Sequence, residues 1–133
     1  MKSKEKPSNS SGAQGTVALN AVNNIFDRWN CTTEEKLTLL GGLKKATFYK
    51  YLKSPESTNI SHDLLERLSY ILNIHASLRI LFSDPESTYG WVRKPNNAPF
   101  FSGKTALEIM LQGRVIDLWN ICSRLDAERG GWA

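Results

Sequence analysis

The sequence predicts an all-α protein, and three observations lead to this fold class. Apolar residues in the segment 19–29 recur at spacings of three and four, the period of a helix with one buried face. Two capping boxes, Thr32 with Glu35 and Thr105 with Glu108, mark the starts of two further helices. No stretch alternates apolar and polar side chains convincingly, as a half-buried strand would. We expect about six to eight short helices.

The composition is that of a globular chain whose positive charge is unevenly placed. Hydrophobic residues make up 41% of the 133 residues, too many for a disordered protein. The formal net charge is +4. Residues 1–60 hold nine Lys and Arg against five Asp and Glu, whereas residues 61–133 hold eight of each. The excess in the first half suits a polyanionic partner there.

Nothing in the sequence indicates export or a membrane segment. No apolar run approaches the roughly 20 residues that span a bilayer, and the first residues lack the apolar core of a secretory signal. The two cysteines, Cys31 and Cys122, suggest neither a disulfide framework nor a zinc site. We therefore expect a cytoplasmic protein with reduced thiols.

The first half is expected to consist of a disordered tail over residues 1–15 and a domain over residues 16–74. The tail is rich in Ser, Lys and Gly. In the domain, the capped helix that starts after Thr32 ends at a glycine pair, and a second helix follows at once and is closed by Pro55. Two helices joined by a short turn with glycine have the spacing of a helix-turn-helix.

The second half, residues 75–133, is expected to be a small helical domain. Ser61 is predicted to cap the helix that precedes this domain, and a separate short helix is predicted over 74–82. The segment 83–104 is predicted to be irregular because it contains three prolines and two glycines. The last two helices start at Thr105 and near Arg114. The final helix is predicted to bury Val115, Leu118, Trp119, Cys122 and Leu125.

The second helix of the helix-turn-helix is basic. Its sequence, KKATFYKYLK, has four lysines and no acid, and Phe48 and Leu52 share its inner face. Lysines neutralise phosphates, and Thr, Tyr and Lys side chains reach base edges in the major groove. An ordinary solvated helix is the alternative interpretation. The candidate DNA-binding residues are Lys44, Lys45, Thr47, Tyr49, Lys50 and Lys53.

No catalytic or metal-binding constellation stands out. Ser61, His62 and Asp63 are adjacent at a helix start, where their side chains diverge and cannot form a triad relay. The glycine pairs lack the flanking pattern of a phosphate loop. Cys122 on an apolar helix face is expected to be a small core residue. We predict that the chain is not an enzyme and needs no cofactor or metal.

The second half also contains a recognisable pattern of residues. GWVRKPN spans Gly90 to Asn96, and GKTALEIMLQGR follows. Together with the basic helix-turn-helix, this pattern resembles the antitoxins of the Xre/MbcA/ParS family over about residues 16–133. Ala106 stands where the family usually has proline, and lysines replace arginines in the basic helix. The matching positions after Asn96 are Gly103, Thr105, Leu107, Glu108, Leu111, Gly113 and Arg114.

The resemblance implies an Xre-like DNA-binding half followed by a toxin-binding domain. Such an antitoxin neutralises a cognate toxin by covering its active site, and the pair represses its own promoter. The toxin is commonly a RES-type enzyme that consumes NAD, or an ADP-ribosyltransferase. A helix-turn-helix protein normally binds two DNA half-sites as a dimer, so we expect a homodimer. The residues that we expect to bind the toxin are Arg114, Arg124, Glu128, Arg129, Gly130, Gly131 and Trp132.

Two alternatives remain open from the sequence. The chain could be a free-standing transcriptional regulator that dimerises through its second half. The helix-turn-helix could also have lost DNA binding and serve only as a scaffold for oligomerisation. Within the antitoxin interpretation, Trp132 is either an anchor in the toxin or a residue that folds back on its own domain.

Overall fold

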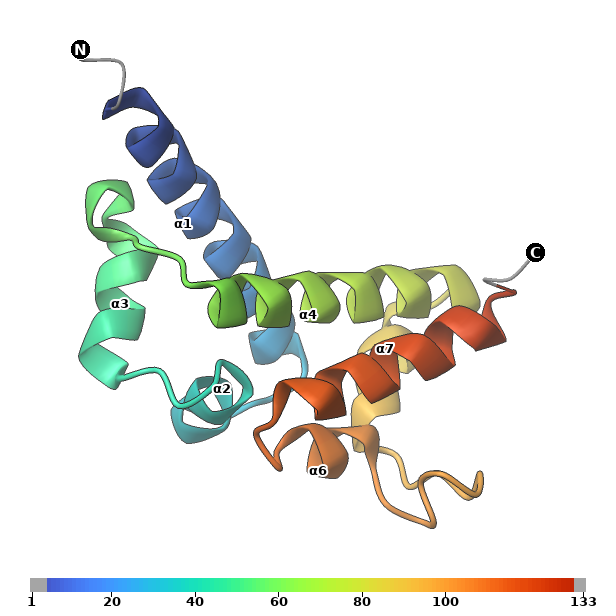
Figure 1. The fold of residues 1–133 in the computed structure, drawn as a ribbon. Coiled ribbons are helices and arrows are strands. Elements are labelled where there is room, and N and C mark those ends of the chain that lie inside the picture. The colour runs from blue at the N-terminus through green and yellow to red at the C-terminus, as the bar shows by residue number, and fades with distance from the viewer. Residues whose placement is uncertain (1–4, 131–133) are drawn as a thin grey trace.

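The computed structural model describes residues 5–130, and the side chains of residues 12–130. Every regular element in this part of the chain is helical, so the all-α prediction is confirmed (Figure 1). None of these helices is long and apolar enough to cross a membrane. The elements are α1 (Glu5–Arg28), α2 (Thr33–Leu39), α3 (Lys45–Lys53), η1 (Pro55–Ser57), α4 (His62–Leu81), α5 (Pro85–Gly90), η2 (Trp91–Arg93), α6 (Ala106–Met110) and α7 (Val115–Glu128).

Two long helices form the centre of the molecule. α4 and α7 lie side by side, and α1 packs against α4 from behind (Figure 1). α3 lies beside α1 at the end of the molecule away from α7, while α6 packs against α7 and η2. One hydrophobic core runs through all of these elements, from Leu19 on α1 to Leu125 on α7. The two halves of the sequence therefore share a core.

The first helix corrects the prediction of a disordered tail over residues 1–15. α1 begins at Glu5, and only residues 1–4 lie outside the described part of this end. The glycines that suggested disorder allow close packing instead. A Cβ atom at Gly12 would overlap the Pro55 carbonyl oxygen, and one at Gly15 would lie 2.6 Å from Ile60 Cγ1. α1 therefore approaches η1 and the segment after it at backbone distance.

A cluster of hydroxyl groups fixes the end of α3 on α1. The Thr16 and Thr58 hydroxyls lie 2.8 Å apart, and Thr16 also donates to the Tyr51 carbonyl at 3.1 Å. Thr58 Oγ1 donates to the Ser54 carbonyl at 3.0 Å, so the last carbonyls of α3 find partners. Asn20 on α1 adds a bond from Nδ2 to the Leu52 carbonyl at 3.1 Å. These bonds orient the basic helix relative to the core.

α4 is one continuous helix, so the prediction of a separate short helix over 74–82 is wrong. Ser61 caps its start by accepting a bond from the Leu64 amide at 3.1 Å, as expected. No proline or glycine follows until after its last residue, so nothing ends the helix near Asn73. Asn73 does not act as a cap, because its Nδ2 lies 3.1 Å from Cys122 Sγ on α7. The helix crosses position 74, where the sequence suggested a boundary between domains.

The segment 83–104 is less irregular than predicted. Asp84 accepts a bond from the Ser87 amide at 2.8 Å, and Pro85 takes the first position of α5. Aspartate followed by proline is a helix start signal. The sequence prediction took Pro85 as part of an irregular segment, whereas it stands at the start of a short helix. η2 follows directly and brings Arg93 to the junction with α1.

Trp119 is a further correction, since the sequence placed it on the buried face of the last helix. Its side chain is 46% exposed, and Ile121 is buried in its stead. Leu118, Ile121, Cys122 and Leu125 follow helical spacing on one face, and Trp119 lies at the flank of that face. An indole group is therefore left on the surface between α4 and α7.

Candidate functional site

The basic helix α3 is held by one face and presents the other. Phe48 is 1% exposed and Leu52 is half-buried, as predicted. Tyr49 is 41% exposed, and its ring packs on Phe48 with centroids 5.2 Å apart. Thr47 is half-buried and the four lysines are exposed. All six candidate DNA-binding residues are therefore at least partly accessible on α3 and at its N-cap: Lys44, Lys45, Thr47, Tyr49, Lys50 and Lys53.

The lysines of α3 carry uncompensated charge. Among the side chains of residues 12–130, none of these four ammonium groups lies within an ion pair. Lys36, on the preceding helix, is by contrast engaged by Asp27 at 2.6 Å. Lys44 and Lys45 stand at the start of α3, where cations are unfavourable beside the helix dipole. A polyanion across this face would remove that repulsion.

The turn before α3 has the hydrogen bonds of a Schellman motif. The Gly42 amide donates to the Leu37 carbonyl at 2.8 Å, and the Gly41 amide donates to the Thr38 carbonyl at 3.0 Å. Both glycines have positive φ, 86° at Gly41 and 80° at Gly42. The sequence predicted this glycine turn, and the structure places it between two helices of a helix-turn-helix.

Arg67 supports the turn from α4, and sequence reasoning missed it. Its Nε donates to Asp63 Oδ2 at 2.8 Å, and one terminal nitrogen donates to the Leu39 carbonyl at 3.4 Å. The residue is only 6% exposed and fills the space beside Gly41, where a Cβ atom would lie 2.8 Å from Arg67 Nε. The spacing of Asp63 and Arg67 on one helix face was the available signal.

The three expected toxin-binding arginines, Arg114, Arg124 and Arg129, all make contacts within the chain. Arg114 pairs with the buried Asp117 at 2.7 Å and so closes the start of α7. The Arg124 guanidinium lies 3.8 Å from the Phe100 ring centroid, which attaches the loop before α6 to α7. Each of these two contacts restrains the arginine side chain, although Arg114 and Arg124 both remain exposed.

The end of α7 contains the remaining expected residues. Arg129 donates to Ser77 Oγ on α4 at 2.9 Å and lies 3.7 Å from Asp126. Glu128 is exposed, and Gly130 has a φ of 74° that suits the turn out of the helix. Gly131 and Trp132 lie outside the described residues.

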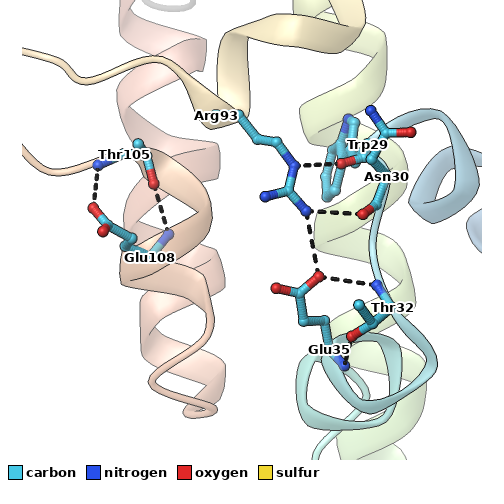
Figure 2. A network of polar contacts seen from close by, with 7 residues as sticks. All are labelled: Trp29, Asn30, Thr32, Glu35, Arg93, Thr105 and Glu108. Atoms are coloured by element: carbon cyan, nitrogen blue, oxygen red, sulfur yellow. Dashed lines mark hydrogen bonds and ion pairs between the residues drawn. The ribbon is translucent and has the colours of Figure 1, made fainter.

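Arg93 joins the two halves of the chain; it lies within the GWVRKPN segment, but the sequence did not predict this contact. Its Nε donates to the Trp29 carbonyl at 2.7 Å, and one terminal nitrogen donates to the Asn30 carbonyl at 3.0 Å. The same nitrogen lies 3.3 Å from Glu35 Oε1. Figure 2 shows that Glu35 also closes the capping box at the start of α2. One guanidinium thus contacts the end of α1 and the first helix of the helix-turn-helix.

The second capping box faces the Arg93 junction. Thr105 and Glu108 exchange bonds of 2.8 and 3.0 Å at the start of α6, as predicted (Figure 2). A cavity of about 190 Å³ separates them from Arg93 and Glu35. Polar side chains from both halves of the sequence therefore line one recess.

The hydroxyl, imidazole and thiol groups that could take part in catalysis have other roles in this structure. The Ser61 hydroxyl is the cap of α4, and His75 Nε2 lies 2.9 Å from the Tyr89 hydroxyl. Burial raises the pKa of Cys31 to about 11, and burial also raises the pKa of Cys122. Both thiols are therefore protonated at neutral pH and are poor nucleophiles. Among the described residues, no group of His, Cys, Asp and Glu side chains could hold a metal ion.

Comparison with known proteins matches both halves of this architecture. Residues 11–73 match the antitoxin Xre-like helix-turn-helix domain, and residues 77–131 match the antitoxin Xre/MbcA/ParS C-terminal toxin-binding domain. The chain belongs to the Xre/MbcA/ParS antitoxin family. The uncharacterized protein y4oB of Sinorhizobium fredii (strain NBRC 101917 / NGR234) is 42% identical over 122 residues, which cover 92% of each chain. No solved structure matches significantly.

The two matched domains assign the parts of this antitoxin. α2 and α3 are the two helices of its helix-turn-helix motif, and α5, α6 and α7 lie in its toxin-binding domain. Arg93 is then a contact between the toxin-binding domain and the DNA-binding domain. Antitoxin and helix-turn-helix domains of these families are typically not enzymes.

Proposed function

We propose that this antitoxin neutralises a RES-type, NAD-consuming toxin and represses its own promoter as a homodimer in the cytoplasm. The toxin-binding domain covers the toxin's active site, and the helix-turn-helix binds the promoter. An ADP-ribosyltransferase toxin is the second candidate partner. The observation that carries the proposal is that one chain combines exposed lysines on α3, which have no ion-pair partner among the described residues, with a matched toxin-binding domain.

The DNA-binding part of the proposal is supported by the charge and anchoring of α3. Its exposed lysines have no carboxylate partner among the described side chains, so they are free to neutralise phosphates. The hydroxyl cluster at Thr16 and Thr58, with Arg67 at the turn, fixes the helix before DNA arrives. Lysine lacks the bidentate fork of arginine, so we expect more affinity from phosphates than from guanine contacts.

The toxin-binding part is supported by the end of α7. Glu128 and Arg129 occupy its last exposed turn, and Gly130 turns the chain out of the helix. We propose that this end and the segment up to Trp132 contact the toxin, with the indole as an anchor. Arg114 and Arg124, which the structure engages internally, contribute by holding α7 in place.

A co-expression assay tests the neutralisation. The neighbouring reading frame is expressed in bacteria alone and together with this chain, while growth and cellular NAD are followed. We expect growth arrest with loss of NAD that co-expression reverses. Arrest with unchanged NAD would replace the RES-type toxin by another enzyme, and a harmless neighbour would favour a free-standing regulator.

A further inference from the structure

A surface hollow lies where α4 and α7 meet. It has a volume of about 250 Å³ and is lined by Glu66, Tyr70, Val115, Ile116 and Trp119. Ile116 and Trp119 each expose 46% of their surface. The Tyr70 hydroxyl donates to Glu66 Oε2 at 3.0 Å, which leaves one carboxylate oxygen at the rim without a bond among the described residues. We call these five residues the Trp119 hollow.

Within the toxin-binding domain, most of the exposed large apolar side chains that the structure describes lie at this hollow. In the described part of the toxin-binding domain, the exposed large hydrophobic residues are Ile80, Ile116 and Trp119. Two of the three lie in the Trp119 hollow, beside the ring of Tyr70. Tryptophan and tyrosine are the residue types that dominate binding energy in protein interfaces, most of all when a partner seals them from water.

The size and charge of the hollow define the chemistry of its occupant. Its volume is below the roughly 300–1,000 Å³ of small-molecule pockets, so it suits one large side chain of a protein. The one charged lining residue is Glu66, which disfavours a phosphate backbone and favours a cation on the partner. An apolar side chain next to a lysine or arginine fits these features.

A second copy of the chain fits less well. A two-fold interface places the same patch against itself, so Glu66 would approach its own counterpart. Like charges that face each other across an interface are unfavourable, and this hollow has no cation of its own to offset them. The matched domain that supplies Val115, Ile116 and Trp119 is named for a different partner, the toxin.

We propose that the Trp119 hollow is a docking site for the cognate toxin, which inserts an apolar side chain and places a cationic group beside Glu66. The inference rests on the proposed function and adds a contact surface distinct from the end of α7. Because Glu66 and Tyr70 lie in the segment matched to the DNA-binding domain, a toxin seated here touches both domains.

The test compares two exposed positions of the same domain. Trp119→Ala removes the centre of the hollow, and Ile80→Ala is the matched control, since Ile80 is 61% exposed and lies outside it. The probe is the purified product of the neighbouring reading frame, freed from its complex. We expect Trp119→Ala to weaken toxin binding at least about tenfold and Ile80→Ala to leave it unchanged.

Three further measurements separate the outcomes. Circular dichroism and promoter affinity report whether Trp119→Ala remains folded, and Glu66→Gln should reduce the salt dependence of toxin binding while keeping an acceptor for Tyr70. Unchanged toxin affinity in Trp119→Ala overturns the assignment, as does a change in oligomeric state with normal toxin affinity. If the wild-type chain does not bind the neighbouring product, the proposed function fails and this site fails with it; if the wild type and Trp119→Ala bind it equally well, the proposed function stands without this site.

Discussion

Arg93 Nε lies 2.7 Å from the Trp29 carbonyl oxygen, and this bond joins the toxin-binding domain to the end of α1. The same side chain also contacts the Asn30 carbonyl and Glu35. A guanidinium that satisfies two carbonyls and a carboxylate stabilises their arrangement more than a single exposed ion pair does. Arg93 therefore adds a polar contact between the two domains to the hydrophobic core that they share.

Replacing Arg93 should loosen that junction. Because its side chain is 42% exposed, we expect Arg93→Ala to lower the free energy of unfolding by about 1–2 kcal/mol. Urea denaturation followed by circular dichroism measures this. Lys94→Ala is the control, since Lys94 is exposed and its side chain makes no ion pair among the described residues. Equal stabilities for the two variants would show that Arg93 does not stabilise the junction between the domains.

The glycines of the turn before α3 should differ in their tolerance to alanine. Both have positive φ, so each substitution strains the backbone by about 1 kcal/mol. At Gly42 no atom lies within 4 Å of the added Cβ, whereas at Gly41 the Cβ would lie 2.8 Å from Arg67 Nε and 2.9 Å from Asp63 Oδ2. The midpoint temperature of thermal unfolding should be lower for Gly41→Ala than for Gly42→Ala. The reverse order would mean that the Arg67 contact does not constrain the turn.

The lysines of α3 should determine the salt dependence of DNA binding. Each phosphate contact contributes about 0.9 to the slope of log affinity against log salt concentration, so Lys45→Ala with Lys50→Ala should reduce the slope by about 2. Fluorescence anisotropy with a promoter fragment at several salt concentrations gives the slope. The control pair, Lys94→Ala with Lys104→Ala, removes the same charge from exposed positions of the other domain. If the two pairs change the slope equally, α3 is not the contact.

Cys31 should make stability fall at high pH. Burial raises its pKa from 9.0 to about 11, so the folded state holds the thiol proton that the unfolded state loses. The contribution is complete below about pH 9 and is lost as the pH rises toward 11. Comparing the denaturation of the wild type and of Cys31→Ser over this pH range isolates the contribution of the Cys31 thiol to stability. The difference in stability between them should narrow with pH, and a constant difference would contradict the shift.

The sequence was informative wherever a local rule set the structure. The capping boxes at Thr32 and Thr105 formed as predicted, because each needs only a partner three residues away. The prediction for Trp119 was wrong because the periodicity of α7 does not reveal which of two neighbouring stripes meets α4. Arg93 was missed because its partners Trp29 and Asn30 lie 64 and 63 residues away. Contacts of that range depend on packing rather than on sequence spacing.

The most direct test of the central claim is a titration of NAD consumption. The purified product of the neighbouring reading frame is incubated with NAD while this chain is added in increasing amounts. Our account predicts that NAD consumption falls to zero at a fixed stoichiometry, and that Trp119→Ala shifts the titration to higher concentration while Ile80→Ala does not. If NAD consumption continues at full rate when this chain is in molar excess over the neighbouring product, neutralisation is contradicted.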